Sequence, residues 1–287
     1  MWVYQLEDAS LYQREEATTC SDHENSNLGS VEQLPLTRWA GVLFNTVFLY
    51  DVRSMLLLTH PLSCDFGFGG SCIEIDANTL LCVGASPDSS AVFALDLSSF
   101  QLQSWPSLVT PRRDVGLAKV KTQFYVFGGH YGKTTLSSCE KMVLADQYWS
   151  EMNSMHYPRA AFTPCHFNSL LYLVSANIYA QRTIETFNAD THTFALLPIS
   201  LPDSLIINVD SVAFVADGEL CLLTNCKQMA RWKIQTEREF RVLGTNRNIW
   251  SRQQPLIIGS FAFIAYKLKV LKFNLQTYSF DEESNSP

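Results

Sequence analysis

The sequence has no long apolar run. Its apolar stretches, such as residues 55–58 and the segment 169–174, are far shorter than the roughly 20 residues that a membrane-spanning helix needs. The first residues also lack the basic region, the apolar region and the small-residue cleavage site of a secretory signal. We therefore expect no membrane segment and a cytoplasmic protein.

An excess of positive charge is missing as well. The 21 Lys and Arg residues are outnumbered by 28 Asp and Glu residues, which gives a formal net charge of −7. Because the chain has no basic field that would concentrate a polyanion, we expect no nucleic-acid binding. Charged residues are only 17% of the chain and hydrophobic residues are 47%, a balance that predicts a globular protein with a sizeable core.

Several common site motifs are absent. The eight cysteines form no C-x-x-C pair and do not alternate with histidines at zinc spacing, so we expect reduced thiols and no metal site. The chain contains no G-x-S-x-G, no G-x-x-x-x-G-K-[ST], no G-x-G-x-x-G opening a helix and no H-E-x-x-H. The glycine-rich segment 66–70 precedes no predicted helix that could hold a phosphate. We therefore expect no cofactor.

The sequence does contain a repeat. An apolar residue, a mostly polar anchor residue and, six positions later, a large apolar residue recur along the chain, with one looser copy at position 233. The anchors lie at positions 5, 51, 96, 143, 188, 233 and 274, in steps of 41 to 47 residues. These steps exceed the roughly 33–34 residues of many helical repeats and match the roughly 40–50 residues of a four-stranded propeller blade. The spacing predicts a β-propeller.

Two pairs of β-prone runs accompany the anchors. Each anchor lies between two runs, such as 90–95 and 100–105, that predict an outer hairpin. A second pair between the anchors predicts an inner hairpin, and long helical patterns are absent. The predicted inner pairs are 72–75 with 80–83, 116–120 with 124–127, 162–166 with 170–174, 211–215 with 220–223, and 256–258 with 261–264.

One segment resembles a known repeat. Phe127-Gly128-Gly129 follows a predicted buried strand, Trp149 ends the outer hairpin, and Pro-Arg pairs at 111–112 and 158–159 open the next inner strands. These features resemble the Kelch repeat, most fully over residues 111–153, whereas other blades have 83–85, 174–176, 223–225 and 264–266 in place of the double glycine. The resemblance implies an all-β, Kelch-type β-propeller of four-stranded blades.

We favour six blades, with seven as the alternative, because six complete units fit between about residue 28 and residue 282. The whole chain, residues 1–287, is then one propeller domain. Within it we expect an extra N-terminal hairpin at 1–16, appended to the ring or shared in its closure, a polar loop at 17–30, blades at 31–282 and a flexible tail at 283–287.

The resemblance also implies where a partner docks. Partners of Kelch proteins usually bind the mouth formed by the turns after the double glycine and the turns between blades, and we expect this surface to be asymmetric here because most blades lack the glycines. The implied binding residues are Arg113, Asp114, His130, Tyr131, Asn177 and Tyr179, with Asp88, Lys227 and Lys267 as weaker candidates. We expect Arg112 and Arg159 to be structural.

Two classes of function remain open. The resemblance favours a non-catalytic module that binds a peptide or protein surface, as a scaffold or a substrate-recognition part. The alternative is a propeller enzyme, such as a hydrolase, an epimerase or a metal-dependent oxidase, that uses the same mouth. A copper oxidase of this class needs two His-Tyr sets on one face, and His130-Tyr131 has no second set at an equivalent turn.

Overall fold

The structure, a computed structural model, describes residues 3–6, 38–43, 45–51, 56–63, 70–84, 90–174, 182–205, 212–224, 226–234, 236–247, 255–266 and 269–281. These residues form strands, turns and loops, and no helix occurs in these ranges. Accordingly, none of them belongs to a helix that could cross a membrane. The predicted polar loop at 17–30 and the predicted tail at 283–287 lie outside the described residues.

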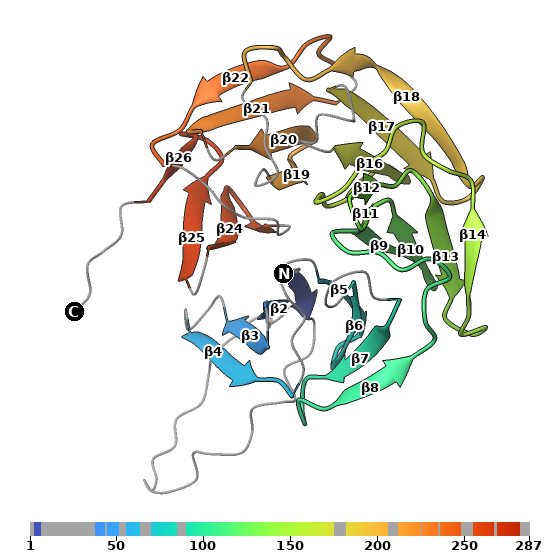
Figure 1. The fold of residues 1–287 in the computed structure, drawn as a ribbon. Helices are drawn as coiled ribbons and strands as arrows, with labels where there is room; N and C mark the ends of the chain where they lie inside the picture. The colour runs from blue at the N-terminus through green and yellow to red at the C-terminus, as the bar shows by residue number, and fades with distance from the viewer. Residues whose placement is uncertain are drawn as a thin grey trace, which may run out of the picture.

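The strands form six four-stranded antiparallel sheets arranged in a ring (Figure 1), which we call blades 1 to 6 in chain order. The all-β class and the six-bladed propeller are thereby confirmed. Blades 1 to 3 consist of β1 (Val3–Leu6), β2 (Arg38–Leu43), β3 (Thr46–Asp51) and β4 (Leu56–Pro61); β5 (Ser71–Asp76), β6 (Thr79–Val83), β7 (Val92–Asp96) and β8 (Leu102–Trp105); and β9 (Gly116–Val120), β10 (Gln123–Phe127), β13 (Cys139–Val143) and β14 (Trp149–Met152).

Blades 4 to 6 have the same order of strands. They consist of β15 (Cys165–Phe167), β16 (Leu170–Val174), β17 (Thr183–Asn188) and β18 (Thr193–Ser200); β19 (Val212–Ala216), β20 (Glu219–Leu223), β21 (Gln228–Lys233) and β22 (Arg241–Gly244); and β23 (Leu256–Ile258), β24 (Phe261–Tyr266), β25 (Lys269–Asn274) and β26 (Ser279–Phe280). The inner hairpins predicted from the sequence are β5–β6, β9–β10, β15–β16, β19–β20 and β23–β24.

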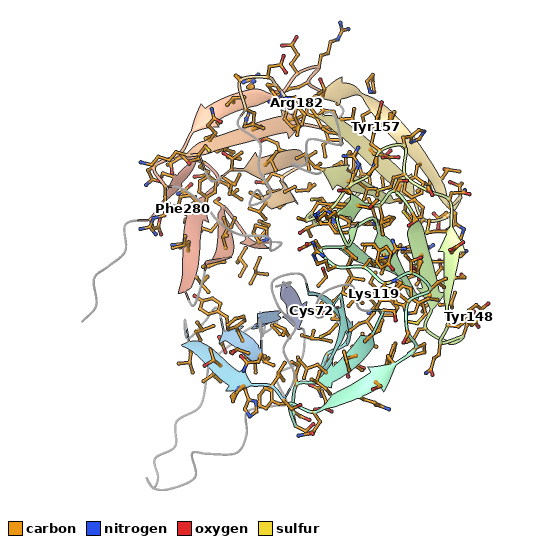
Figure 2. The ribbon with its side chains drawn as sticks, viewed as in Figure 1. Cys72, Lys119, Tyr148, Tyr157, Arg182 and Phe280 are labelled. Carbon is orange, nitrogen blue, oxygen red and sulfur yellow. The ribbon has the colours of Figure 1, made fainter. Side chains whose placement is uncertain are left out.

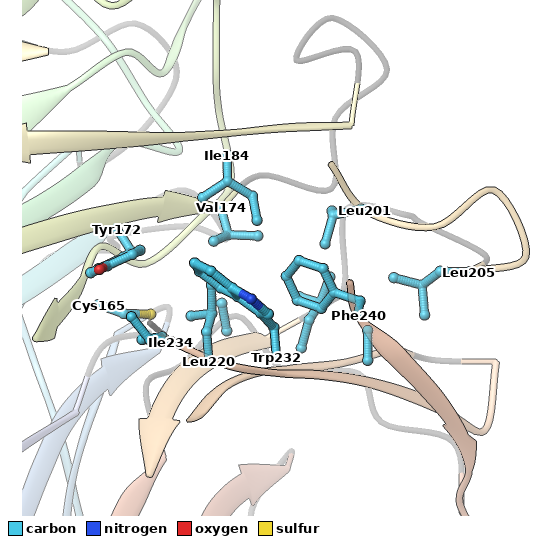
Figure 3. Packing of buried hydrophobic residues seen from close by; sticks show 13 residues of the cluster. Cys165, Tyr172, Val174, Ile184, Leu201, Leu205, Leu220, Trp232, Ile234 and Phe240 are labelled. Atoms are coloured by element: carbon cyan, nitrogen blue, oxygen red, sulfur yellow. The ribbon is translucent and has the colours of Figure 1, made fainter. Parts of the chain in front are cut away.

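The core lies between the blades. The second strands of blades 3 and 4, β10 and β16, are apolar and almost wholly buried, as expected for a strand covered by neighbouring sheets on both faces. Figure 3 shows one of these contacts, where Tyr172 of blade 4 faces Trp232 of blade 5 and Phe240 lies on the other side of the indole. The rings of Tyr172 and Trp232 meet edge to face, with centroids 6.5 Å apart. Apolar packing between blades therefore holds the ring together.

The N-terminal strand differs from the prediction. The pattern around Gln5 suggested an extra outer hairpin at 1–16, but β1 instead pairs with β2 and lies nearest the centre of the ring (Figure 1). It contacts β5 and β23, the first strands of blades 2 and 6. The apolar-polar pattern does not specify which neighbour a short strand pairs with. Residues 7–16 of the predicted hairpin lie outside the described residues.

The ring closes by side-chain packing between its first and last blades. Phe48 and Tyr50 of β3 form one buried cluster with Leu256 of β23 and Phe263 of β24. Each of the six sheets is built from strands that are successive in their own part of the chain, so blades 1 and 6 share no sheet in the described residues. The closure consequently depends on apolar contact and on β1 at the centre.

The connections of blades 2 to 6 lie on two opposite faces, because strand direction alternates within each blade. The first-to-second and third-to-fourth connections share one face, which we call the turn face. There Leu97 N donates to Asn78 O at 2.7 Å. The second-to-third connections and the linkers between blades share the other face, which we call the mouth face. There Leu108 N donates to Ser90 O at 2.8 Å.

Candidate functional site

The double glycine of blade 3 is required by close backbone packing. Gly128 and Gly129 have φ values of +55° and +96°, which disfavour residues with a side chain. A Cβ at Gly128 would lie 2.1 Å from the carbonyl oxygen of Arg159, and one at Gly129 would lie 2.6 Å from that of Arg113. The two glycines thus allow the connection of blade 3 to lie directly against the linkers on both of its sides.

A small hairpin follows the glycines on the mouth face. β11 (His130–Tyr131) pairs with β12 (Thr134–Thr135), and Gly132 in the turn has a φ of +56°. The linker before blade 3 extends this hairpin, because Arg113 N donates to His130 O at 3.0 Å and His130 N donates to Arg113 O at 2.8 Å. We call residues 130–135 the mouth hairpin.

Side-chain contacts hold the mouth hairpin in place. Arg113 Nη2 donates to the carbonyl oxygen of Gly132 at 3.3 Å, and Arg113 Nε lies 3.5 Å from Asp114 Oδ2. The hydroxyl of Thr135 lies within hydrogen-bonding distance of His130 Nδ1, at 3.2 Å. Tyr131, in contrast, is 52% exposed. The hairpin therefore combines a backbone fixed at several points with an aromatic side chain open to solvent.

Four of the predicted binding residues come together here. Arg113, Asp114, His130 and Tyr131 all belong to the mouth hairpin or to the linker that pairs with it. The structure thus places them at one site, although their role in binding stays a prediction. The other predicted binding residues, Asn177 and Tyr179, lie outside the described residues, as do the weaker candidates Asp88 and Lys267.

The weaker candidate Lys227 lies on the same face but in another blade. It is exposed, with a φ of +55°, in the connection between the second and third strands of blade 5. Its carbonyl oxygen accepts a hydrogen bond from Thr245 N at 2.8 Å, which ties this connection to the next linker.

Sequence reasoning missed Lys133, an exposed residue at the tip of the mouth hairpin. Its position directly after Tyr131-Gly132, in a turn that follows a double glycine, is the signal that could have identified it. A lysine at such a tip is well placed to reach a partner, because its charge lies at the end of a long side chain.

The mouth face is asymmetric in the lengths of its connections. The second-to-third connections span residues 84–91, 128–138, 175–182, 224–227 and 267–268 in blades 2 to 6, respectively. The connection that carries the mouth hairpin is the longest of these. Blade 3 consequently contributes more chain to the mouth face than the short connections of blades 5 and 6.

Arg112 is structural, as expected. The guanidinium is fully buried and forms an ion pair with the buried Glu140 of β13, with 2.8 Å between Nη2 and Oε1. It also donates to the carbonyl oxygens of Gly128 and Ser138 at 3.0 and 2.8 Å. Glu140 in turn accepts from the backbone N–H of Val109 at 2.8 Å. The pair fastens the linker to the third strand of blade 3.

Arg159 and Glu185 repeat this arrangement in blade 4. Arg159 Nε lies 3.4 Å from Glu185 Oε2, and both side chains are fully buried. Burial lowers the pKa of Arg159, and the neighbouring Glu185 partly opposes this shift. Glu185 also accepts from the backbone N–H of His156, whose Nδ1 lies 2.6 Å from Glu185 Oε1. Sequence reasoning missed both glutamates, although each lies in the third strand of its blade and follows an Arg of the preceding linker.

The buried thiols are not suited to nucleophilic chemistry. Burial raises the pKa of Cys139 to about 12 and that of Cys221 to about 12, so both are protonated at neutral pH, and the thiolate is the reactive form. Cys139, Cys165 and Cys221 are buried and form no disulfide. Within the described part of the chain, no three His, Cys, Asp or Glu side chains are grouped so that they could hold a metal ion.

Comparison with known proteins assigns the blade that carries this site. Residues 111–156 match the family model of the Kelch motif, and this segment runs from the Arg112–Arg113 linker through β14 to His156. No curated protein matches the chain in a sequence search. Together with the ring of six four-stranded blades, this match shows a β-propeller that contains a Kelch motif in blade 3.

Proposed function

We propose that this chain is a non-catalytic interaction module that binds a peptide or a protein surface on its mouth face, in a scaffold or substrate-recognition role. Kelch propellers are commonly protein-interaction modules, and this fold carries the Kelch motif in blade 3, whose second-to-third connection is the longest among those of blades 2 to 6. The mouth hairpin, with Arg113, Asp114, His130 and Tyr131, is the centre of the proposed contact.

The observation that supports the proposal is that the exposed Tyr131 lies on a hairpin whose backbone is already fixed by hydrogen bonds within the chain. Two backbone hydrogen bonds join Arg113 to His130, and Arg113 Nη2 reaches the carbonyl oxygen of Gly132. A preorganised loop loses little conformational entropy on binding. Tyrosine adds a large contact area and a hydroxyl for a directional hydrogen bond, which is why it often dominates interface energetics.

A matched pair of tyrosines tests the proposal. Tyr131 is 52% exposed on the mouth face, and Tyr148 is 60% exposed in the turn-face connection of the same blade, where Figure 2 shows it at the outer edge of the ring. Partners retained by the wild-type chain would be identified by mass spectrometry and quantified on variants. We expect Tyr131→Ala combined with Arg113→Ala to reduce retention and Tyr148→Ala to leave it unchanged.

Two results would overturn the proposal. One is retention that is unaffected by the mouth-face variant but lost in Tyr148→Ala, since the binding surface would then lie on the turn face. The other is turnover in a broad substrate screen that is abolished by the mouth-face variant, because the same residues would then belong to an enzyme. Circular dichroism and thermal melting of each variant establish that its fold is intact.

A further inference from the structure

The mouth face carries positive charge although the chain as a whole is acidic. In the described linkers and second-to-third connections of blades 2 to 6, cations outnumber acids. This set does not include Arg112 and Arg159, which are buried in ion pairs. The cations are Arg113, Lys133, Arg182, Lys227 and Arg247, and the acids are Asp114 and Asp203.

The turn face has the opposite charge. In the described first-to-second and third-to-fourth connections of blades 2 to 6, acids outnumber cations. The acids are Asp146, Asp190, Asp217, Glu237 and Glu239, and the cations are Lys121 and Arg238. The connections on the two ends of the ring therefore differ in sign, which a total of −7 for the chain conceals.

Local pairing does not remove the positive excess of the mouth face. Arg113 lies 3.5 Å from Asp114, and Arg182 Nε lies 3.5 Å from Asp203 Oδ1. These two pairs account for both acids in the set. Lys133 and Lys227 are exposed and belong to neither of these pairs, and Lys133 lies at the tip of the mouth hairpin near the exposed Tyr131.

We infer that the partner presents an acidic peptide segment, rich in Asp or Glu, to the mouth face beside Tyr131 and Lys133. This inference rests on the proposed function and adds the chemistry of the partner. Complementary charge orients a partner and raises its rate of association. Lysine and arginine side chains pair with carboxylates, while the tyrosine ring supplies apolar contact.

The overall charge favours a short acidic segment over a nucleic acid. Charges interact over a Debye length of about 8 Å at physiological ionic strength, so a short peptide on the mouth face responds mainly to the cations around it. A long polyanion extends beyond this face and meets the field of a chain with a net charge of −7. An acidic peptide segment is thus the occupant that the charge distribution fits.

The test is a selection of peptides on the full chain. A displayed random peptide library is selected on the immobilised protein, and the affinities of the enriched peptides are measured by fluorescence anisotropy. We expect enrichment of Asp and Glu, and affinity that falls as NaCl is raised from about 50 to about 300 mM. Lys133→Glu is expected to weaken binding about fivefold or more. The matched control Arg238→Glu reverses an exposed charge on the turn face and should leave the affinity unchanged.

Other outcomes separate the two claims. Peptides without acidic enrichment that lose affinity on Tyr131→Ala would overturn the inference and leave the proposed function standing. Peptides whose affinity falls on Arg238→Glu but not on Lys133→Glu or Tyr131→Ala would overturn the proposed function as well. Failure to enrich any peptide, or binding of a single-stranded RNA oligonucleotide that depends on Lys133, would overturn the acidic-peptide inference.

Discussion

Gly128→Ala should destabilise the propeller far more than the same change at Gly132. Both glycines have left-handed backbone conformations, with φ values of +55° and +56°, so both variants incur the same conformational cost of about 1 kcal/mol for an alanine. Their surroundings differ. A Cβ at Gly128 would lie 2.1 Å from the carbonyl oxygen of Arg159 and 2.9 Å from that of Leu136, whereas a Cβ at Gly132 meets nothing within 4 Å.

The difference between the two variants follows from the hydrogen bonds around Gly128. Relieving the contact with Arg159 requires that this linker move away from the connection of blade 3. That movement breaks two backbone hydrogen bonds, from Gly129 N to Arg159 O at 2.8 Å and from Arg159 N to Leu136 O at 3.1 Å. Each contributes about 1 kcal/mol. We therefore expect a loss of about 3 kcal/mol for Gly128→Ala and about 1 kcal/mol for Gly132→Ala.

Urea denaturation of the two variants and the wild type, followed by tryptophan fluorescence, measures these losses directly. Because the conformational cost is common to both glycines, the difference between the variants isolates the close packing of linker and connection. If the two variants lose the same unfolding free energy, the packing derived for the double glycine is wrong.

Three further predictions concern the core and the turn face. Trp149→Ala should lower the unfolding free energy, measured by urea denaturation, by about 3–5 kcal/mol, because the indole is buried and its Nε1 donates to the carbonyl oxygen of Pro106 at 3.0 Å. A loss under about 1 kcal/mol would contradict the buried position of Trp149. Glu140→Gln should lower the unfolding free energy by about 3–5 kcal/mol, because it leaves the buried charge of Arg112 unpaired. The control Glu151→Gln, at the exposed position directly opposite on β14, should leave the unfolding free energy nearly unchanged. Equal losses in the two variants would contradict this. Burial, and to a smaller extent the charge of Lys141, lowers the pKa of His192 below its ordinary 6.5. As the pH drops below about 6.5, the unfolded chain binds a proton at His192 before the folded chain does, so the unfolding free energy should fall. A His192→Asn variant whose unfolding free energy depends on pH between about 7 and 5 as steeply as that of the wild type would refute this.

The blades were predictable because a repeated local pattern specifies them. An apolar strand, a tight turn such as Asp217-Gly218 and a second apolar strand recur at nearly constant spacing, and each hairpin joins neighbours in sequence. β1 was not predictable in the same way. Its partner β2 begins more than thirty residues later, and nothing in a four-residue strand selects that partner over an adjacent run.

The candidate site was predicted in part for a similar reason. His130 and Tyr131 come directly after the double glycine, so their place on the mouth face follows from the repeat. The pairing of Arg113 with His130 joins two segments that are far apart in the chain, and no local pattern encodes it. Glu140 was missed because an acid within a strand resembles a solvent-facing position until the buried Arg112 beside it is known.

Photo-crosslinking from the exposed positions 131 and 148 shows which face of the ring touches a partner. A photoreactive benzoylphenylalanine is introduced at position 131 or at position 148 of the full chain, and adducts formed in cell extract are identified by mass spectrometry. We expect a specific partner adduct from the Tyr131 position on the mouth face and none from the Tyr148 position on the turn face. Partner adducts from the Tyr148 position alone, or from neither position, would contradict this expectation.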